Sequence, residues 1–442
     1  MYLHSRYLLI VLMLMQPAAA SALSLVEAYQ LALQNDAAYQ SAVFENEAGQ
    51  QYKVLGLSNL LPVVSASYAY NKNKAEIDFK SLTGTRTEDR DYKSEVATLQ
   101  LRQPLINFEG MARYRLGTTQ TLLSDQHLVL HTQELIVRVF NKYATALYSE
   151  NLLALAIAQR DAYAEQKKSN EYMFKKGEST KTDAIESQAK FDLAEAEVIE
   201  AQDALANERN ALTKIVGQEV TLLNPLLTDF KVQFMHPASF DEWKAIAEQK
   251  NPEIIAQQYS LEIAKEDVNR NRAGHMPRLD AIASLNKSES DTTNSFNQTS
   301  TTKSIGLQLT VPIYSGGSVS ALTSQAQSNQ QKAQSELDKK TNEVLIDLKK
   351  QYSSAVSSTH RIEALETAVK SAQLLIEATR KSVSGGTRTN LDVLNAERQL
   401  FEAKRDLALA RYNYLQSYLS LRKAAGTVNV SDLQVVAGYF SQ

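Results

Sequence analysis

Two long stretches of the chain combine a helical pattern of hydrophobic residues with an absence of helix-breaking residues. No proline lies between Pro104 and Pro225 or after Pro312, and glycine is missing from 118–176 and 318–384. Proline and glycine are the residues that most disfavour a helix interior. Runs such as "IEALETAVKSAQLLIEATRKSV" repeat apolar residues at helical spacing. The pattern predicts two very long helices. The first, over 109–176, would be on the order of 100 Å long and would need a partner along its length.

A second pattern, strict alternation of apolar and polar residues, occurs in four shorter stretches. They are "VVSASYAYN", "SEVATLQLRQ", "LDAIASLN" and "SIGLQLTVP". Alternation with a period of two is typical of strands whose sheet has one wet face. The sequence therefore predicts two β-hairpins, over 63–103 and 278–312. The long polar segments 71–91 and 286–303 are interpreted as the loops that join their strands.

The two halves of the chain resemble each other. "LRQPLINFEG" at 101–110 parallels "LTVPIYSGG" at 309–317, and "KKGESTKTDAI" at 175–185 parallels "SGGTRTNLDVL" at 384–394. The pairs are separated by roughly the same distance, which indicates a tandem duplication. We expect a first repeat at 23–230 and a second at 231–442. Each repeat would contain a helix, a hairpin, a long helix, a tip turn (177–182 or 385–388) and a further helix.

The N-terminus has the features of a secretory signal peptide over 1–22. Arg6 provides a positive start, residues 8–15 are apolar, and "ASA" at 20–22 offers a small-residue cleavage site. The apolar run is too short for the alternative, a signal-anchor helix, because crossing a bilayer takes roughly 20 residues. We expect the mature chain to start near Leu23. No later stretch is apolar enough for a transmembrane helix, so a membrane-spanning mature chain would have to use β-strands.

Composition excludes several classes of function. The 47 basic and 50 acidic residues give a net charge of -3, without the basic excess expected of a nucleic-acid-binding protein. There is no cysteine, hence no disulfide, no thiolate metal site and no lipid attachment at an N-terminal cysteine. His127 and His131 have a spacing that could bind zinc, but the glutamate of a metalloprotease helix is missing, which favours polar packing positions. We find no catalytic motif and expect neither an enzyme nor a cofactor.

The duplicated unit, the strand ends "QPLINFEG" and "VPIYSGG", and the segment "GTRTNLDVLNAERQLFEAKRDLALARYNYL" resemble the TolC family of outer-membrane efflux and secretion channels. The resemblance covers essentially the whole mature chain. It implies an α+β membrane protein that forms a homotrimer, in which four strands per chain complete a twelve-stranded barrel in outer-membrane lipid. The long helices would form a coiled-coil tunnel across the periplasm. The implied partners are a periplasmic adaptor protein and an inner-membrane transporter of the ABC or RND type.

The resemblance also implies a periplasmic entrance at the two tip turns. Carried over by position, Arg388 is the gate arginine, Asp183 its acceptor, and Asp392 a member of an acidic constriction ring. Asn395 stands where the best-known member has a second ring aspartate, and Val383 where it has a gate tyrosine. We therefore expect easier opening and weaker block by multivalent cations. The alternative role for both aspartates is helix capping, because each follows a threonine in a Thr-x-x-Asp pattern.

Five tip residues match the positions where family members receive the adaptor: Gly177, Glu178, Ser179, Gly386 and Thr387. For the two glycines, the alternative is turn geometry, because only glycine adopts positive φ freely.

The function that the resemblance implies is export across the periplasm and outer membrane. The missing lipidation cysteine and the short segment after Gly426 favour type I protein secretion. Multidrug efflux is the alternative within the channel class. A periplasmic coiled-coil adaptor or scaffold would share the long helices but would not need four amphipathic strands.

Overall fold

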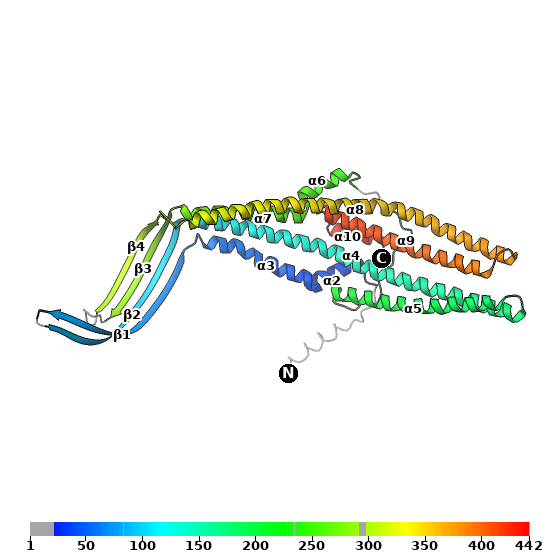
Figure 1. Cartoon of the computed structure of the whole chain (residues 1–442), viewed down its shortest axis with the longest axis horizontal. Helices are drawn as coiled ribbons and strands as arrows, with labels where there is room; N and C mark the ends of the chain where they lie inside the picture. Colours follow the sequence, from blue (N-terminus) through cyan, green and yellow to red (C-terminus); the bar gives the residue numbers. More distant parts are fainter. Residues whose placement is uncertain (1–21, 83, 228, 233–235, 291–297, 442) are drawn as a thin grey trace, which may run out of the picture. The chain divides into compact units, whose positions relative to one another are not determined.

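The computed structural model describes residues 22–82, 84–227, 229–232, 236–290 and 298–441, so nearly all of the predicted signal peptide lies outside the described residues. Within these ranges, no helix is long and apolar enough to cross a membrane. The elements (Figure 1) follow the order α2 (Leu25–Asn35), α3 (Ala37–Ser58), β1 (Val63–Ser81), β2 (Gly84–Ile106), α4 (Phe108–Lys176), α5 (Lys181–Val216), α6 (Phe240–Lys250), α7 (Pro252–Arg272), the 3-10 turn η1 (Ala273–His275), β3 (Arg278–Ser290), β4 (Gln298–Thr310), α8 (Ser318–Ser384), α9 (Asn390–Ala424) and α10 (Val430–Ala437).

The same order of elements occurs twice along the chain. In each series a short helix and a longer one are followed by two strands, a very long helix and a helix about half its length. The very long helices, α4 with 69 residues and α8 with 67, occupy the stretches without proline. Capping side chains separate the first two helices of each series. Asp36 Oδ1 accepts a hydrogen bond from the Tyr39 backbone at 2.8 Å, and Asn251 Oδ1 accepts one from the Glu253 backbone at 2.9 Å.

The chain forms two compact structural units. The first contains residues 1–44, 128–254 and 341–442, and the second contains residues 45–127 and 255–340. The second unit holds the sheet, and the first unit holds both tip turns.

The sheet is antiparallel throughout, with the order β1-β2-β3-β4. Its register separates an apolar face from a polar face. One row across the four strands is Val64, Leu101, Ala283 and Ile305, and the next row along is Ser65, Gln100, Ser284 and Ser304. The apolar side chains are exposed in the single chain, as Ile305 at 89% and Leu307 at 70% illustrate. The predicted one-sided hairpins are therefore confirmed, and within the described ranges no other layer of the chain covers their apolar face.

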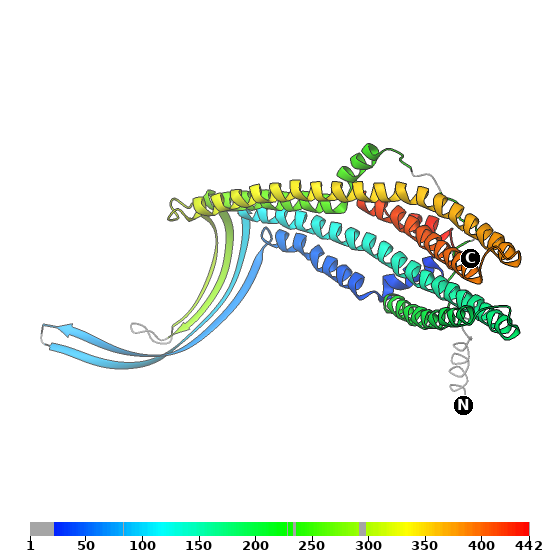
Figure 2. The same cartoon turned by 45° about the vertical axis from the view of Figure 1, so that its right-hand side comes forward.

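The predicted loop over 71–91 is wrong. Pairing between β2 and β3 ends at Ser94, whereas β1 and β2 remain paired to Ser81 and Gly84 and form a two-stranded ribbon (Figure 2). In the part of β1 that precedes the ribbon, the apolar face is formed by residues with even numbers, Val64, Ala66, Tyr68 and Tyr70. In the ribbon the apolar residues have odd numbers, as in Ala75 and Ile77, so the alternation continues with its polarity reversed.

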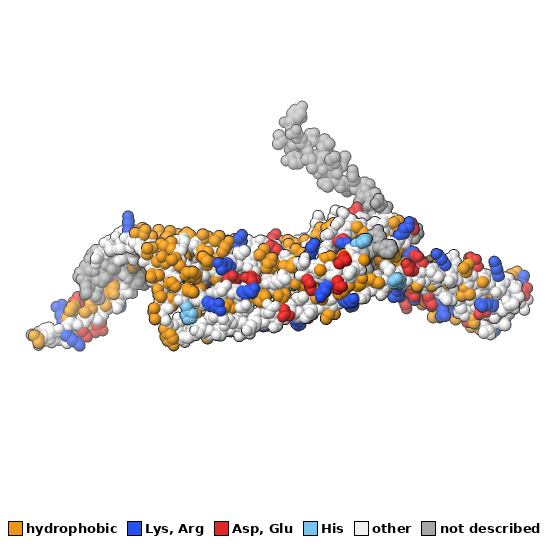
Figure 3. Space-filling model, turned by 90° about the horizontal axis from the view of Figure 1, so that it is seen from above, with side chains coloured by type: hydrophobic (Ala, Val, Ile, Leu, Met, Phe, Trp, Pro, Cys, Tyr) orange, Lys and Arg blue, Asp and Glu red, His pale blue; other side chains and the backbone are white. Residues whose placement is uncertain are grey.

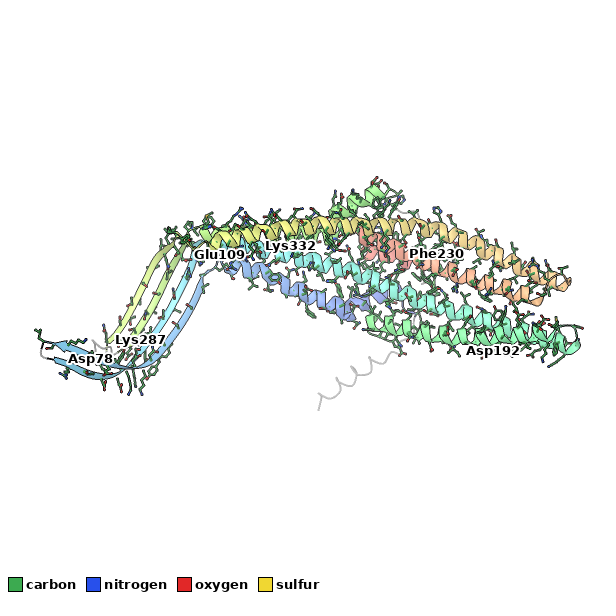
Figure 4. All side chains as sticks on the ribbon, in the orientation of Figure 1. Asp78, Glu109, Asp192, Phe230, Lys287 and Lys332 are labelled. Carbon is green, nitrogen blue, oxygen red and sulfur yellow. The ribbon has the colours of Figure 1, made fainter. Side chains whose placement is uncertain are left out.

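Charged residues replace apolar ones on the other face of this ribbon. Lys74 pairs with Asp91 across the strands at 3.8 Å, and Thr87 Oγ1 donates to Asp78 Oδ1 at 2.6 Å. Figure 4 labels Asp78 on this ribbon. Cross-strand pairs of this kind stabilise a ladder without burial. The second predicted loop is wrong in part, since 286–290 and 298–303 are strand and 291–297 lies outside the described residues.

The main core of the first unit gathers side chains from α2, α4, α5, α9 and α10. Tyr143 and Phe140 are fully buried in it. The Tyr143 hydroxyl donates to the Leu23 carbonyl at 2.9 Å and accepts from the Asn224 backbone at 3.1 Å. Val220 and Phe230 after α5, and Leu433 and Phe440 near the C-terminus, also belong to this core. Trp243 is 3% exposed and lies in a second core cluster with α8 and α9 residues.

Candidate functional site

The two tip turns share one backbone geometry. At the end of α4 the Glu178 amide donates to the Met173 carbonyl at 2.9 Å, and at the end of α8 the Thr387 amide donates to the Ser382 carbonyl at 3.0 Å. These bonds belong to the Schellman motif, which needs a left-handed residue just after the helix. Gly177 (φ 75°) and Gly386 (φ 73°) supply it. A Cβ added at either glycine would meet nothing within 4 Å, so both turns present an open surface in the single chain.

Asp183 caps helix α5. Its Oδ2 accepts hydrogen bonds from the Thr180 hydroxyl at 2.7 Å, the Thr180 backbone at 3.0 Å and the Ser179 hydroxyl at 3.1 Å. Bonds to the Thr180 side chain, and then to its backbone, lower the pKa of the Asp183 carboxyl below its ordinary value. The capping interpretation is thus realised in the geometry, and the half-buried carboxylate is charged at neutral pH.

Asp392 occupies the matching position on α9. Its Oδ2 accepts from the Thr389 backbone at 2.9 Å and from the Thr389 hydroxyl at 3.0 Å. The backbone bond lowers the pKa of the Asp392 carboxyl most, followed by the Thr389 hydroxyl, and the nearby charge of Arg388 adds a smaller effect in the same direction. Both candidate acidic residues are therefore held in place by the turn that precedes them.

Arg388 lies between Gly386 and Thr389 and is exposed. Its Nη1 donates to the Thr379 hydroxyl at 3.5 Å, which is a long hydrogen bond. Among the described residues of one chain, no ion pair joins Arg388 to Asp183. The guanidinium thus has donors that remain available to groups outside its own chain.

Asn395 lies one helical turn beyond Asp392 and contacts a residue that the sequence interpretation missed. Its Oδ1 accepts a hydrogen bond from the Lys190 ammonium on α5 at 3.3 Å. Lys190 is seven residues after Asp183, and this heptad spacing on a coiled-coil helix was the available signal. A small core of Tyr163, Ala194 and Leu394, with Phe191 packed against it, joins α4, α5 and α9 nearby.

The sequence interpretation missed a second pair, which joins the two helices on either side of the second tip turn. Arg380 on α8 donates to Glu397 Oε1 on α9 at 2.7 Å, and Glu397 is 5% exposed. The pair joins the two helices within about two turns of the tip. No local pattern marks it, because the two residues become neighbours only when the hairpin closes.

His127 and His131 both lie on α4, and His131 contacts an acidic residue of the same helix. His131 Nδ1 lies 3.1 Å from Glu134 Oε2 on the same helix. In the described part of the chain, no group of three or more histidine, cysteine, aspartate or glutamate side chains is arranged to hold a metal ion.

Comparison with known proteins connects this geometry to a family. The family model described as outer membrane efflux protein matches residues 28–218 and 244–427. The alkaline protease secretion protein AprF of Pseudomonas aeruginosa is 42% identical over 95% of this chain and 88% of its own length. The proteases secretion protein PrtF of Dickeya chrysanthemi is 36% identical over 98% of this chain and 94% of its own.

The fold has solved counterparts. The crystal structure of CusC, whose title refers to transmembrane channel formation, aligns with a TM-score of 0.79 at 18% identity and covers 92% of both chains. The predicted fold class, with four strands and very long helices per chain, is confirmed by this likeness. The chain is an outer membrane channel protein and belongs to the outer membrane efflux protein family.

Proposed function

We propose that this channel exports proteins by type I secretion, as the outer-membrane component of a complex with a periplasmic adaptor and an inner-membrane transporter. The observation that carries this proposal is similarity over nearly the whole chain to two proteins named for protease secretion. The channel itself performs no chemistry. It provides a passive path, and the inner-membrane partner, of the ABC type in this proposal, supplies energy and selects the cargo.

The proposed assembly is a homotrimer. A four-stranded sheet leaves its two outer strands with unpaired edges, which cannot remain unpaired in lipid. Three copies would close twelve strands in a ring, with the apolar faces of Ile305 and Leu307 toward lipid and the Ser65 to Ser304 row toward the channel. The exposure of that apolar face in the single chain supports this orientation.

The proposed gate lies at the periplasmic end of the helices. Asp183, Arg388, Asp392 and Asn395 would surround the entrance, and Arg388 would form its latch with acceptors that include a neighbouring copy. Its guanidinium is exposed and, among the described residues of its own chain, makes one long hydrogen bond, which is consistent with this role. Because both aspartates are charged and fixed by capping bonds, three copies would place a ring of fixed negative charge there.

The adaptor would dock on the tip turns through Gly177, Glu178, Ser179, Gly386 and Thr387. Two arguments support this surface. The turns are open, with no atom near the missing Cβ positions, and they have the same backbone geometry. Each chain would thus offer two equivalent sites, and a trimer would offer six.

Two measurements test the proposal. Deleting the chain from its host should abolish protease activity in the medium while the protease accumulates inside the cell, and supplying the chain should restore secretion. Unchanged protein secretion with lost resistance to small toxic compounds would instead indicate multidrug efflux. In a planar bilayer, the purified trimer should show a small conductance that rises several-fold in Arg388→Ser. Equal conductance in the two would contradict the latch.

A further inference from the structure

Lys190 places a positive charge beside the proposed constriction. Its ammonium donates to Asn395 Oδ1 at 3.3 Å, and in the described part of the chain no carboxylate lies within ion-pair distance of it. Asn395 follows Asp392 by three residues on α9, so their side chains share one face of the helix. The ammonium is therefore held about one helical turn from the Asp392 ring.

The surroundings restrict where this ammonium can go. Lys190 is half-buried, whereas Asn395 is exposed. The next residue, Phe191, packs against the small core of Tyr163, Ala194 and Leu394, and the Lys167 ammonium lies 4.9 Å from the centre of its ring. Because α5 is fixed to α9 by this core, the Lys190 side chain projects from an anchored base toward Asn395.

The charges beside Asn395 cancel. Asp392 contributes one negative charge per chain, Asn395 contributes none, and Lys190 contributes one positive charge; Asp183 and Arg388 at the same entrance contribute one charge of each sign. Charges within about 10 Å of each other interact in ordinary salt, and a narrow passage with low-dielectric walls strengthens their field. Figure 3 shows basic and acidic side chains intermixed over the end of the molecule where α8 ends and α9 begins. A residue that neutralises one ring can therefore change which ions enter.

We infer that Lys190, positioned by its hydrogen bond to Asn395, sets the ion selectivity of the entrance by neutralising the Asp392 ring. This inference rests on the proposed gate at the tip turns. It concerns a residue outside the set matched by family resemblance, and it accounts for Asn395 as the acceptor that holds the ammonium. An entrance of nearly zero net charge repels acidic polypeptide segments less, and retains basic ones less, than a strongly acidic ring would.

The test measures the reversal potential of purified trimers in a planar bilayer under a tenfold salt gradient. Lys190→Met removes the charge and the donor, and should shift the reversal potential toward cation selectivity. It should also increase block by trivalent cations at least several-fold. Lys190→Gln keeps a donor but no charge and should shift selectivity equally. Lys190→Arg should behave as the original channel.

Two further variants separate the effect of where the Lys190 ammonium is held from the effect of its charge. Asn395→Ala releases the ammonium without removing it, and should shift selectivity in the same direction by a smaller amount. Lys142→Met is the matched control, because Lys142 also joins two helices, pairing with Glu208 at 3.5 Å, but belongs to the part of α4 beside the main core. It should leave the reversal potential unchanged.

The outcomes distinguish this inference from the proposed function. If Lys190→Met and Lys190→Gln keep the original reversal potential while Arg388→Ser still increases conductance, the gate stands and the role of Lys190 is refuted. If Lys142→Met shifts selectivity as much as Lys190→Met, the effect is one of overall charge and the inference fails. If Arg388→Ser leaves conductance unchanged, the gate itself is wrong, whatever the Lys190 variants do.

Discussion

The adjacent glycines of the second tip turn allow turn geometry to be separated from adaptor docking. Gly386 has φ 73°, whereas Gly385 has an ordinary backbone and would place an added Cβ at a normal 3.6 Å from the Lys381 and Ser382 carbonyl oxygens. Alanine should therefore be tolerated at Gly385. At Gly386 the left-handed conformation should cost about 1–2 kcal/mol, with no steric term because nothing lies within 4 Å.

This cost corresponds to roughly a 5- to 30-fold larger population of the opened turn. Opening of the turn can be followed by proteolysis, because trypsin cleaves after arginine and Arg388 lies in the turn. When opening and closing are fast relative to cleavage, the cleavage rate follows the open population. Cleavage after Arg388 should thus accelerate about 5- to 30-fold in Gly386→Ala and remain near the original rate in Gly385→Ala.

Gly386→Asn completes the series, since asparagine tolerates the left-handed region better than alanine does. Its cleavage rate should lie close to the original one. If this variant nevertheless loses secretion, the adaptor needs the bare glycine surface; if it secretes normally, Gly386 serves turn geometry. Equal cleavage rates in Gly385→Ala and Gly386→Ala would refute the reasoning, because positive φ would then carry no cost.

Three further predictions concern stability. Tyr143→Phe leaves buried backbone groups at Leu23 and Asn224 without the hydroxyl, and should destabilise that region by about 1–3 kcal/mol, seen as faster amide exchange at Asn224; unchanged exchange would contradict it. Gly426→Ala combines positive φ with a Cβ placed against the Lys250 carbonyl, so it should lower the melting temperature of the helical part, in contrast to Gly385→Ala. Because the folded pKa of Asp183 is lowered, its capping contribution is complete above the ordinary carboxyl pKa and is lost as pH falls through the lowered value. Tip cleavage by pepsin should rise over that acidic range, and less so in an Asp183→Asn variant.

The sequence predicted correctly those features that depend on residues close together in the chain. The stretches without proline and glycine correctly predicted the two long helices: α4 begins at Phe108, one residue before the predicted start, and ends at Lys176, and α8 occupies the glycine-free stretch from Ser318 to Ser384. The Thr-x-x-Asp patterns predicted both capping arrangements, since each involves residues three apart. Period-two alternation predicted the four strands.

The misses arise from two physical causes. The two-stranded ribbon of β1 and β2 was interpreted as a loop because one of its faces is charged. The alternation of apolar and polar residues continues in the ribbon, but the apolar residues shift from even to odd positions. Lys190 was missed because its partner Asn395 is 205 residues away and approaches only when α5 and α9 pack together. The heptad spacing of Lys190 from Asp183 indicates the face of α5 on which Lys190 lies, but it does not identify the partner on α9.

The reversal of polarity in β1 also indicates how thick a lipid layer the protein fits. On β2 the apolar face extends from Ile106, paired with Leu279, to Ala97, opposite Tyr68. These roughly ten residues span about 33 Å along the strand. With the strand tilt of roughly 40° found in transmembrane barrels, the apolar band is about 25 Å high. The charged ribbon begins beyond Tyr70 and lies in water, so its first residues mark the outer boundary of the hydrocarbon layer.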